Sequence, residues 1–443
     1  AIVMKWSFLI FSAGLLQQSH FLIRMNGYGC ITILIIRVTT SLFFLMIDGF
    51  MNFNKENLIN FGKQPVSNRF LYNINDNAPS FDLGLDICIN TGLVCINKPF
   101  PISEVKPRYG WITCFEPEEH LDNLTQTIIN LPGITKSSVF GAYSFKDDST
   151  IDRVRNNGFN KTWRIDPKDD LNLDNIFLSV ESYQDSLNSE KVNNIIKKNG
   201  QADVFIIRHV LEHSYDIVSF VNFIKLFIKD NGYIVWEIPD CERAISAGDC
   251  TIVWEEHTFY FTEFTFKIFL HECGFSIEYY KCVQYPLENS IIAIVKNNTN
   301  YEYTLEGDLV QHEINRARQF VDKINYRRDV IRKKLVDISS KYGDIAIFGG
   351  GHLSVAFISI LNLSDLFNYV VDDNENKKGM YMPIGKIPII DSKSMIQKGI
   401  SVCLLALNPQ NHNLVISNND NFVKNGGIFL SIFPGTNNYI EDY

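Results

Sequence analysis

Beyond residue 137, apolar runs alternate with amphipathic stretches, and this alternation predicts an α/β fold. The continuous apolar runs at 202–210 and 232–240 are typical of strands that are buried on both faces of a parallel sheet. Between them, residues 216–232 carry apolar side chains at helical spacing and finish with Gly232, which predicts an amphipathic helix. The other elements expected in this sheet lie at 137–144, 149–158, 161–166, 262–275 and 288–295.

The C-terminal part of the chain resumes this alternation after a long charged helix, which is predicted over residues 306–341. Strands and a helix are then expected at 344–351, 352–364, 367–374, 387–391, 401–408 and 426–434. We therefore predict an α/β protein with two Rossmann-like parallel-sheet domains joined by a long helix. The expected divisions are a small loop-rich region at 51–105, sheet domains at 106–300 and 343–443, and a linker helix at 301–342.

Residues 1–50 differ from the rest, because they hold three basic residues, one acidic residue and apolar runs at 6–16 and 30–47. The first run is too short to span a bilayer, and the second has Arg37 near its middle. Three interpretations stay open: a non-native or poorly ordered extension, a packed or peripheral element, and a membrane anchor. The first is favoured, with the working protein beginning near Met51.

The composition narrows the class of protein and its partners. With 46% hydrophobic and 21% charged residues the chain is globular, and its net charge of −9 argues against a nucleic-acid polymer as partner. Nine cysteines without a C-x-x-C pair are too few for a disulfide scaffold and lack the spacing of a zinc ribbon. We expect a cytoplasmic protein with reduced thiols and a small-molecule partner, without a membrane association; the oligomeric state stays open.

Candidate binding residues gather at the carboxyl ends of the predicted strands, where open α/β sheets bind ligands. Gly141 and Ser144 lie in the turn after the first strand, and Arg208 and His209 end the third. Asp166 ends the second strand, where an acidic side chain can accept hydrogen bonds from both hydroxyls of an adenosine ribose. The alternative for Asp166 is a solvated loop acid.

Two short segments combine an imidazole with neighbouring carboxylates, which suits a general base. They are the Glu-His pair at 212–213 and the Glu-Glu-His run at 255–257. The alternative is that both histidines only stabilise turns. A zinc site made by His209, His213 and His257 lacks the ligand spacing of known sites and is not expected.

A run of three glycines separates a strand and a helix in the C-terminal part. Gly349, Gly350 and Gly351 let the backbone approach a ligand, and the N–H groups at the helix N-terminus could hold a diphosphate. Asp372 ends the next strand, in the ribose-binding position of that unit. A tight packing turn is the alternative.

Several of these motifs together resemble a known family. RHVLEH, EIPD, WEEHTFYFT and YPLENSI occur in this order, with INFGKQPVSNRFL before them and IAIFGGGHLS and VVDDNENKKGMYMPIGKIPII after them. Over residues 58–435 this arrangement is similar to that of the C-methyltransferases that act on nucleotide-linked deoxysugars. The resemblance implies a class I methyltransferase-like domain at 106–300 that binds S-adenosyl-L-methionine, and a substrate domain at 343–443.

The resemblance also implies roles for single residues. Glu256 and His257 match the family's Glu-His pair, so His257 is expected to remove a proton from the sugar carbon while Glu256 orients it. His120 is similar to an upstream active-site histidine. The cofactor is expected at Gly141, Ser144, Asp166, Arg208 and His209. The nucleotide sugar is expected at Glu212, His213, Trp254, Gly349, Gly350, Gly351, His352 and Asp372.

Two departures from the family's pattern affect these expectations. Cys88 remains from an N-terminal zinc-binding cluster, but Thr91 stands where a second cysteine would complete C-x-x-C, so no bound metal is expected. The glycine-rich turn keeps only Gly141, so Ser144 and backbone N–H groups are expected to replace it. The main hypothesis is S-adenosylmethionine-dependent C-methylation of a nucleotide-linked keto-deoxysugar or a similar small molecule. The alternative is a sugar-nucleotide-binding protein or an isomerase-like enzyme without methyl transfer.

Overall fold

The computed structural model describes residues 54–111, 116–174, 179–297 and 307–443. Residues Asn54–Tyr443 form one compact unit. Residues 1–50, for which the sequence leaves three interpretations open, lie outside the described residues. In the part of the chain that the structure describes, no helix is both long enough and apolar enough to cross a membrane.

A four-stranded antiparallel sheet makes up most of the N-terminal region. Its order is β1 (Lys55–Pro65), β2 (Ser80–Cys88), β3 (Val94–Ile96) and β8 (Phe259–Tyr260), and the short α2 (Ile102–Val105) follows β3. The sequence predicted loops here, because much of β1 and the start of β2 is polar and exposed. β8 begins two residues after His257 and pairs with β3, so this sheet anchors the loop that carries His257.

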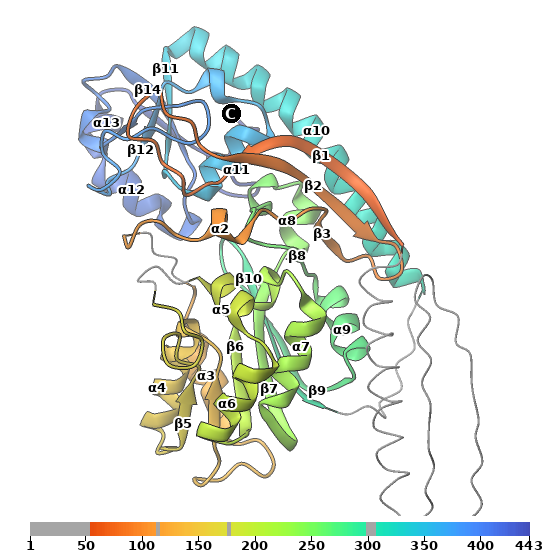
Figure 1. The fold of residues 1–443 in the computed structure, drawn as a ribbon. Coiled ribbons are helices and arrows are strands. Elements are labelled where there is room, and N and C mark those ends of the chain that lie inside the picture. The colour runs from red at the N-terminus through yellow and green to blue at the C-terminus, as the bar shows by residue number, and fades with distance from the viewer. Residues whose placement is uncertain (1–53, 112–115, 175–178, 298–306) are drawn as a thin grey trace, which may run out of the picture. The chain divides into compact units, whose positions relative to one another are not determined.

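The central sheet is mostly parallel, as predicted. Its order is β5 (Thr162–Arg164), β4 (Phe140–Ala142), β6 (Ala202–Arg208), β7 (Ile228–Asp240), β10 (Asn289–Asn297) and β9 (Phe275–Val283). The first four strands are parallel, whereas β10 is antiparallel to both of its neighbours (Figure 1). The edge strand β9 was not predicted from the sequence.

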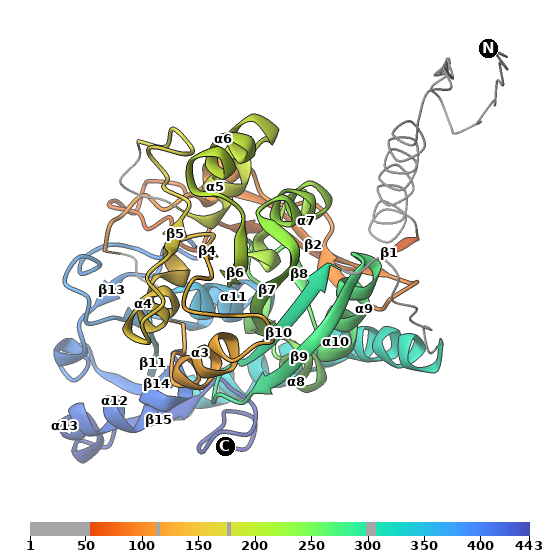
Figure 2. The ribbon, with the colours of Figure 1, turned by 90° about the horizontal axis from the view of Figure 1, so that it is seen from below.

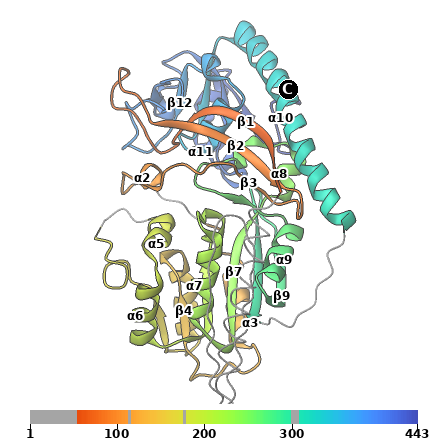
Figure 3. The ribbon, with the colours of Figure 1, turned by 45° about the vertical axis from the view of Figure 1, so that its right-hand side comes forward.

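Helices cover both faces of the central sheet (Figure 2; Figure 3). α3 (Leu121–Ile129) and α4 (Asp148–Asn156) pack on one face, and α6 (Ser189–Asn199) and α7 (Ile217–Leu226) lie on the other. The remaining elements of this part are α5 (Val180–Ser186), α8 (Glu242–Ala247), α9 (Glu263–Glu272) and the 3₁₀ helices η1 (Phe145–Asp147), η2 (Leu211–His213) and η3 (Cys250–Ile252). This arrangement leaves the carboxyl ends of the strands free for a site.

The predicted helix over residues 216–232 is wrong at its C-terminal end. α7 ends at Leu226, and β7 begins at Ile228, so Gly232 lies inside a strand. Ile228 pairs with Ala202 of β6 and is buried, so its side chain belongs to the sheet. The apolar residues at the end of α7 and at the start of β7 follow one another without a polar gap, so the sequence pattern does not show where the helix ends.

The C-terminal domain is a second parallel sheet. It follows the 36-residue helix α10 (Gly307–Tyr342), in the order β13 (Ile389–Ile390), β12 (Tyr369–Val371), β11 (Asp344–Phe348), β14 (Ile400–Leu405) and β15 (Ile428–Ser431). The other elements are α11 (His352–Ile360), α12 (His412–Asn418), α13 (Asp420–Lys424), η4 (Ser364–Leu366), η5 (Ser392–Ser394) and η6 (Pro409–Asn411). The predicted architecture of two Rossmann-like sheets joined by a long helix is thus confirmed.

The long helix α10 ties the C-terminal domain to the central one. Arg327 pairs with Glu441 (Nε–Oε1 2.6 Å) and donates to the carbonyl of Gly248, just after α8 (2.5 Å). Phe320 and Leu335 of α10 belong to one apolar core that also includes residues of β2, β3 and β11. This shared core fixes the second sheet beside the N-terminal sheet and α8.

Candidate active site

A cavity of about 830 Å³ adjoins the carboxyl ends of both parallel sheets. On the central-sheet side it is lined by residues that follow β4 and β6, such as Phe145 and His213. On the other side it is lined by residues that follow β11 and β12, such as His352 and Asp372. Ligands of open α/β sheets bind at this end of the strands, so this cavity is the candidate active site.

The loop at 254–257 and the C-terminal glycine turn meet at the cavity wall. The Trp254 indole stacks on the His352 imidazole, with ring centroids 4.4 Å apart and an angle of 17° between the planes. Burial lowers the pKa of His352 to about 4, so this ring is neutral at physiological pH. The stack therefore presents an uncharged aromatic surface to a ligand.

The Asp372 carboxylate stabilises the glycine turn through hydrogen bonds. Its Oδ2 accepts hydrogen bonds from the Gly350 N–H and from Lys377 Nζ, both at 2.8 Å. Gly349 has a φ of +106° and approaches the Ala406 carbonyl so closely that a Cβ would lie 2.7 Å from it. The turn is thus held together partly by its own packing. The Gly350 N–H and the Asp372 carboxylate were predicted to bind a nucleotide sugar, but here they form a hydrogen bond with each other.

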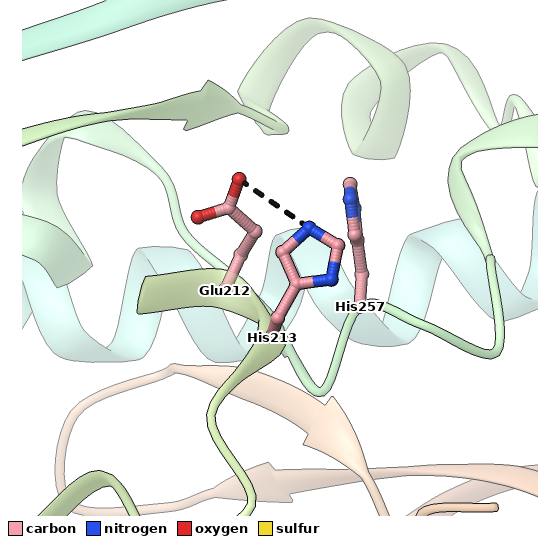
Figure 4. Close-up of side chains that lie close together, drawn as sticks. All are labelled: Glu212, His213 and His257. Carbon is pink, nitrogen blue, oxygen red and sulfur yellow. Dashed lines mark ion pairs between the residues drawn. The ribbon is translucent and has the colours of Figure 1, made fainter. Parts of the chain in front are cut away.

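Two histidines and two carboxylates form a cluster next to the cavity, in which His257 is half-buried and the other three are buried. His213 in η2 donates its Nδ1–H to Glu181 Oε1 at 2.6 Å. Its ring lies at 84° to that of His257, with centroids 4.7 Å apart, and its Nε2 lies 4.0 Å from Glu212 Oε1 (Figure 4). Burial, followed by the nearby His213, holds the pKa of His257 well below its usual range.

Glu256 does not pair with His257 as the sequence suggested. Its Oε1 instead accepts a hydrogen bond from the Asn68 amide at 3.3 Å, and the residue lines the cavity. Burial, together with the charges of Glu181 and Glu255, holds the pKa of Glu256 well above its usual range. The role predicted for Glu256 as the orienting partner of His257 therefore has no supporting contact in the structure.

A second charged network is centred on Glu237, which is fully buried in β7. Its Oε2 pairs with Arg208 Nε at 2.5 Å, and its Oε1 accepts from the Ser290 hydroxyl at 2.7 Å. Its Oε1 also lies 3.0 Å from His120 Nε2 and 3.2 Å from His209 Nε2. Although burial opposes ionisation, Arg208 and the histidines hold the pKa of Glu237 well below its usual range.

The network explains where the predicted residues His120 and His209 point. His120 also contacts the Tyr285 hydroxyl through Nδ1 at 2.7 Å, so both of its ring nitrogens face protein groups. Burial lowers the pKa of His209, but the carboxylates of Glu116, Glu212 and Glu237 outweigh it and raise the pKa to about 10. Both histidines thus contact the Glu237 carboxylate, which pairs with Arg208, and neither of them lines the cavity.

The turn after β4 differs from the predicted cofactor turn. Gly141 lies in β4, where a Cβ would be 2.6 Å from the Phe205 ring and 2.8 Å from the Trp163 ring. Ser144 is fully buried and caps η1, where its hydroxyl accepts from the Lys146 N–H at 3.3 Å. Both residues shape the turn by packing and capping, and neither is among the residues that line the cavity.

Asp166 also lies away from the cavity lining. Its Oδ1 accepts hydrogen bonds from the backbone N–H groups of Lys168 and Asp169 at 2.9 and 2.8 Å. These contacts correspond to the loop acid that the sequence left as the alternative. They account for one carboxylate oxygen of Asp166 without any ligand.

The structure thus brings together only part of the predicted set. Among the described residues, the predicted residues that line the cavity are Arg208, His213, Trp254, Glu256, Gly350, Gly351, His352 and Asp372. The predicted residues outside its lining are His120, Gly141, Ser144, Asp166, His209, Glu212, His257 and Gly349. Sequence analysis missed Asn68, Phe145, Glu181 and Lys377, which also line it. Asn68 lies within the motif INFGKQPVSNRFL, so that motif was the available signal; Glu181 had none.

Residues 284–434 match a protein family described as "C-methyltransferase C-terminal domain". This stretch, about a third of the chain, is similar to that family's domain. The match covers the glycine turn, β11 and β12, and it confirms the expectation that the chain is a methyltransferase. No curated protein matches the sequence of this methyltransferase.

The methyltransferase is also similar to solved structures at low sequence identity. One is 1,6-didemethyltoxoflavin-N1-methyltransferase from Burkholderia thailandensis with bound 1,6-didemethyltoxoflavin and S-adenosylhomocysteine (10% identity, 41% of this chain, 80% of that chain, TM-score 0.28). A second is a SAM-dependent methyltransferase from Leishmania major (15% identity, 39% of this chain, 70% of that chain, TM-score 0.24). A third is a SAM-dependent methyltransferase from Aquifex aeolicus (12% identity, 40% of this chain, 93% of that chain, TM-score 0.26).

Proposed function

We propose that this methyltransferase transfers a methyl group from S-adenosyl-L-methionine to an acidic carbon of a small keto compound, of the nucleotide-linked deoxysugar class. The observation that carries the proposal is that one cavity of about 830 Å³ adjoins the carboxyl ends of both Rossmann-like sheets. Its volume is near the upper end of the roughly 300–1,000 Å³ of ligand pockets, which leaves room for a cofactor and a substrate together.

The cofactor fits the part of the cavity that follows β4 and β6. Arg208 lines this part, and its Nη2 is buried without a hydrogen-bond partner among the described residues. A guanidinium with a free donor suits the methionine carboxylate of the cofactor. Phe145, in the turn that keeps only Gly141, lines the wall but leaves the cavity open. This open turn favours methyl transfer over the alternative of a scaffold that no longer binds the cofactor.

Glu256 is the group that we propose as the base. Its carboxylate lines the cavity, whereas His257 is not among the described residues that line it. The step uses the ionised form of Glu256, which its raised pKa makes a stronger base than an ordinary carboxylate. A carbon next to a carbonyl group gives up its proton to this carboxylate, which leaves an enolate. The enolate carbon then attacks the sulfonium methyl group in line, and the S–CH₃ bond breaks to give S-adenosylhomocysteine. The Asn68 amide positions the carboxylate for this step.

The substrate's nucleotide is proposed to lie against the C-terminal wall. The Trp254–His352 stack supplies a flat aromatic surface, and Lys377 supplies a positive charge beside the Gly350 carbonyl. The N-terminus of α11, which begins after Gly351, offers N–H groups for a phosphate. These contacts support a substrate that carries both an aromatic ring and an anionic group.

Calorimetry with S-adenosylmethionine and with S-adenosylhomocysteine tests the cofactor, and mass spectrometry of candidate keto sugars tests methyl transfer. Glu256→Gln should keep the cofactor affinity and lose about 10²–10⁴ in turnover, as expected for removal of a general base. Glu190→Gln, on the exposed face of α6, is the matched control and should keep full turnover. Near-normal turnover in Glu256→Gln would move the base elsewhere, and absence of cofactor binding in the parent protein would refute the proposed function.

A further inference from the structure

Three side chains with metal-binding atoms come together beside the cavity, and the proposed methyl transfer uses none of them. They are Glu212, His213 and His257 (Figure 4). One ligand atom of each lies within 4.8 Å of the ligand atoms of the other two. Two imidazoles and one carboxylate form a donor set that zinc and ferrous iron both accept in proteins.

His213 is held in the manner of a metal-binding histidine. Its Nδ1–H donates to Glu181 Oε1 at 2.6 Å, which fixes the ring and turns Nε2 toward Glu212. Metal-binding histidines commonly donate their second ring nitrogen to a carboxylate in this way. Glu181 therefore orients the His213 ring, and His213 Nε2 is the ring nitrogen that is left to bind a metal ion.

Two atoms of this cluster also lack the partners that burial demands. His213 and Glu212 are 3% and 1% exposed. Among the described residues, neither His213 Nε2 nor Glu212 Oε2 has a hydrogen-bond partner. Buried polar atoms without a partner are unfavourable, and a cation shared by both residues would satisfy them.

We propose that Glu212, His213 and His257 bind one divalent cation of the zinc or ferrous class. Ligand atoms about 2.0–2.2 Å from zinc lie roughly 3.4 Å apart in a tetrahedron, so ligand atoms that lie within 4.8 Å of one another close by at most about 1.4 Å on binding. Of the three proposed ligands His213 lines the cavity, so we place a remaining coordination position on the cavity side of the cluster.

The cation would act as a Lewis acid on the substrate. A carbonyl oxygen bound at the open position becomes more polarised, and the enolate left after proton transfer to Glu256 is stabilised as it forms. This catalytic role rests on the proposed function, whereas metal binding itself does not. The site contains no thiolate, so it differs from the cysteine-based zinc that sequence analysis excluded. It shares His213 and His257 with the histidine set that sequence analysis did not expect to bind zinc, and Glu212 takes the place of His209 in it.

Cobalt(II) is the probe for this site, since its absorption reports the ligands without any activity measurement. The full chain is stripped with a chelator and titrated with CoCl₂, and occupancy is measured by equilibrium dialysis with metal analysis. We expect one cobalt per chain with visible bands of a nitrogen- and oxygen-ligated ion. His257→Asn and Glu212→Gln should each lower the affinity by at least tenfold, and Glu181→Gln by about 10–100-fold.

His412→Asn is the matched control, because His412 lies in α12 and bonds the Leu407 carbonyl through Nε2. It should bind cobalt as the parent chain does. The proposal would be overturned by near-ultraviolet thiolate-to-cobalt bands or by less than one cobalt per chain. It would also be overturned if His257→Asn, Glu212→Gln and Glu181→Gln all bound cobalt as tightly as the parent chain. Because S-adenosylmethionine binding is measured separately on the stripped chain, loss of the metal inference and loss of the proposed function give different results.

Discussion

Replacing Glu237 by glutamine tests the charged network beneath the cavity. Glutamine keeps the size of the side chain but removes the negative charge that faces Arg208 at 2.5 Å. Arg208 and Glu237 are 1% and 0% exposed, so solvent cannot compensate the guanidinium. Removing one partner of a buried ion pair typically costs about 3–5 kcal/mol, because the other charge stays buried without its counter-charge.

Thermal unfolding of the full chain measures this cost. With an unfolding entropy of about 2.1 cal/mol/K per residue, a destabilisation of 1 kcal/mol lowers Tm by roughly 1 °C in a unit as long as Asn54–Tyr443, so Glu237→Gln should lower Tm by roughly 3–6 °C. In an Arg208→Met background the same substitution should cost at least about 1 kcal/mol less, since no buried charge is left unpaired. The exposed Glu190→Gln should shift Tm by no more than about 1–2 °C.

The pH dependence gives an independent check. Because the pKa of Glu237 is lowered in the folded protein, its stabilising effect is fully present above its ordinary value of 4.5 and is lost as the pH falls through the lower folded pKa. The difference between the parent and Glu237→Gln should therefore be constant from pH 6 to 8 and shrink only in acid. A shift below 2 °C at pH 7, or a deficit that is the same in both backgrounds, would refute this account of the network.

Three further substitutions test the fold and the site. Gly141→Ala should cost about 1–3 kcal/mol, because its Cβ would meet the Phe205 ring at 2.6 Å, whereas Gly351→Ala has open space and should be nearly neutral in thermal unfolding. Thr262→Ala should lower stability by about 0.5–2 kcal/mol, since its hydroxyl accepts from the Thr265 N–H at the start of α9; equal Tm values would remove this cap. Arg208→Lys should weaken S-adenosylmethionine binding about tenfold or more in calorimetry, and unchanged affinity would take Arg208 out of the cofactor site.

The candidate site was predictable only where function and local sequence coincide. Gly350, His352 and Asp372 lie at the ends of strands with clear apolar patterns, and the structure has them on the cavity wall. His120 and His209 are similar in sequence context, yet they face the buried Glu237. Nothing in a one-dimensional pattern separates a histidine that faces a cavity from one that faces a buried carboxylate, because the difference depends on strands 28 or more residues away.

The sequence by itself predicted every strand of both parallel sheets except β9, and the long helix between the sheets, because apolar runs are a local consequence of burial. Tertiary structure decided what these elements present to a ligand. Only pairing across the sheet shows that Gly141 is a packing position and that β10 runs antiparallel to its neighbours. The cluster of Glu212, His213 and His257 likewise depends on tertiary structure. β8 pairs with β3, and the loop before β8 is held next to η2, where the Thr258 hydroxyl donates to the carbonyl of Glu212, 46 residues earlier in the chain.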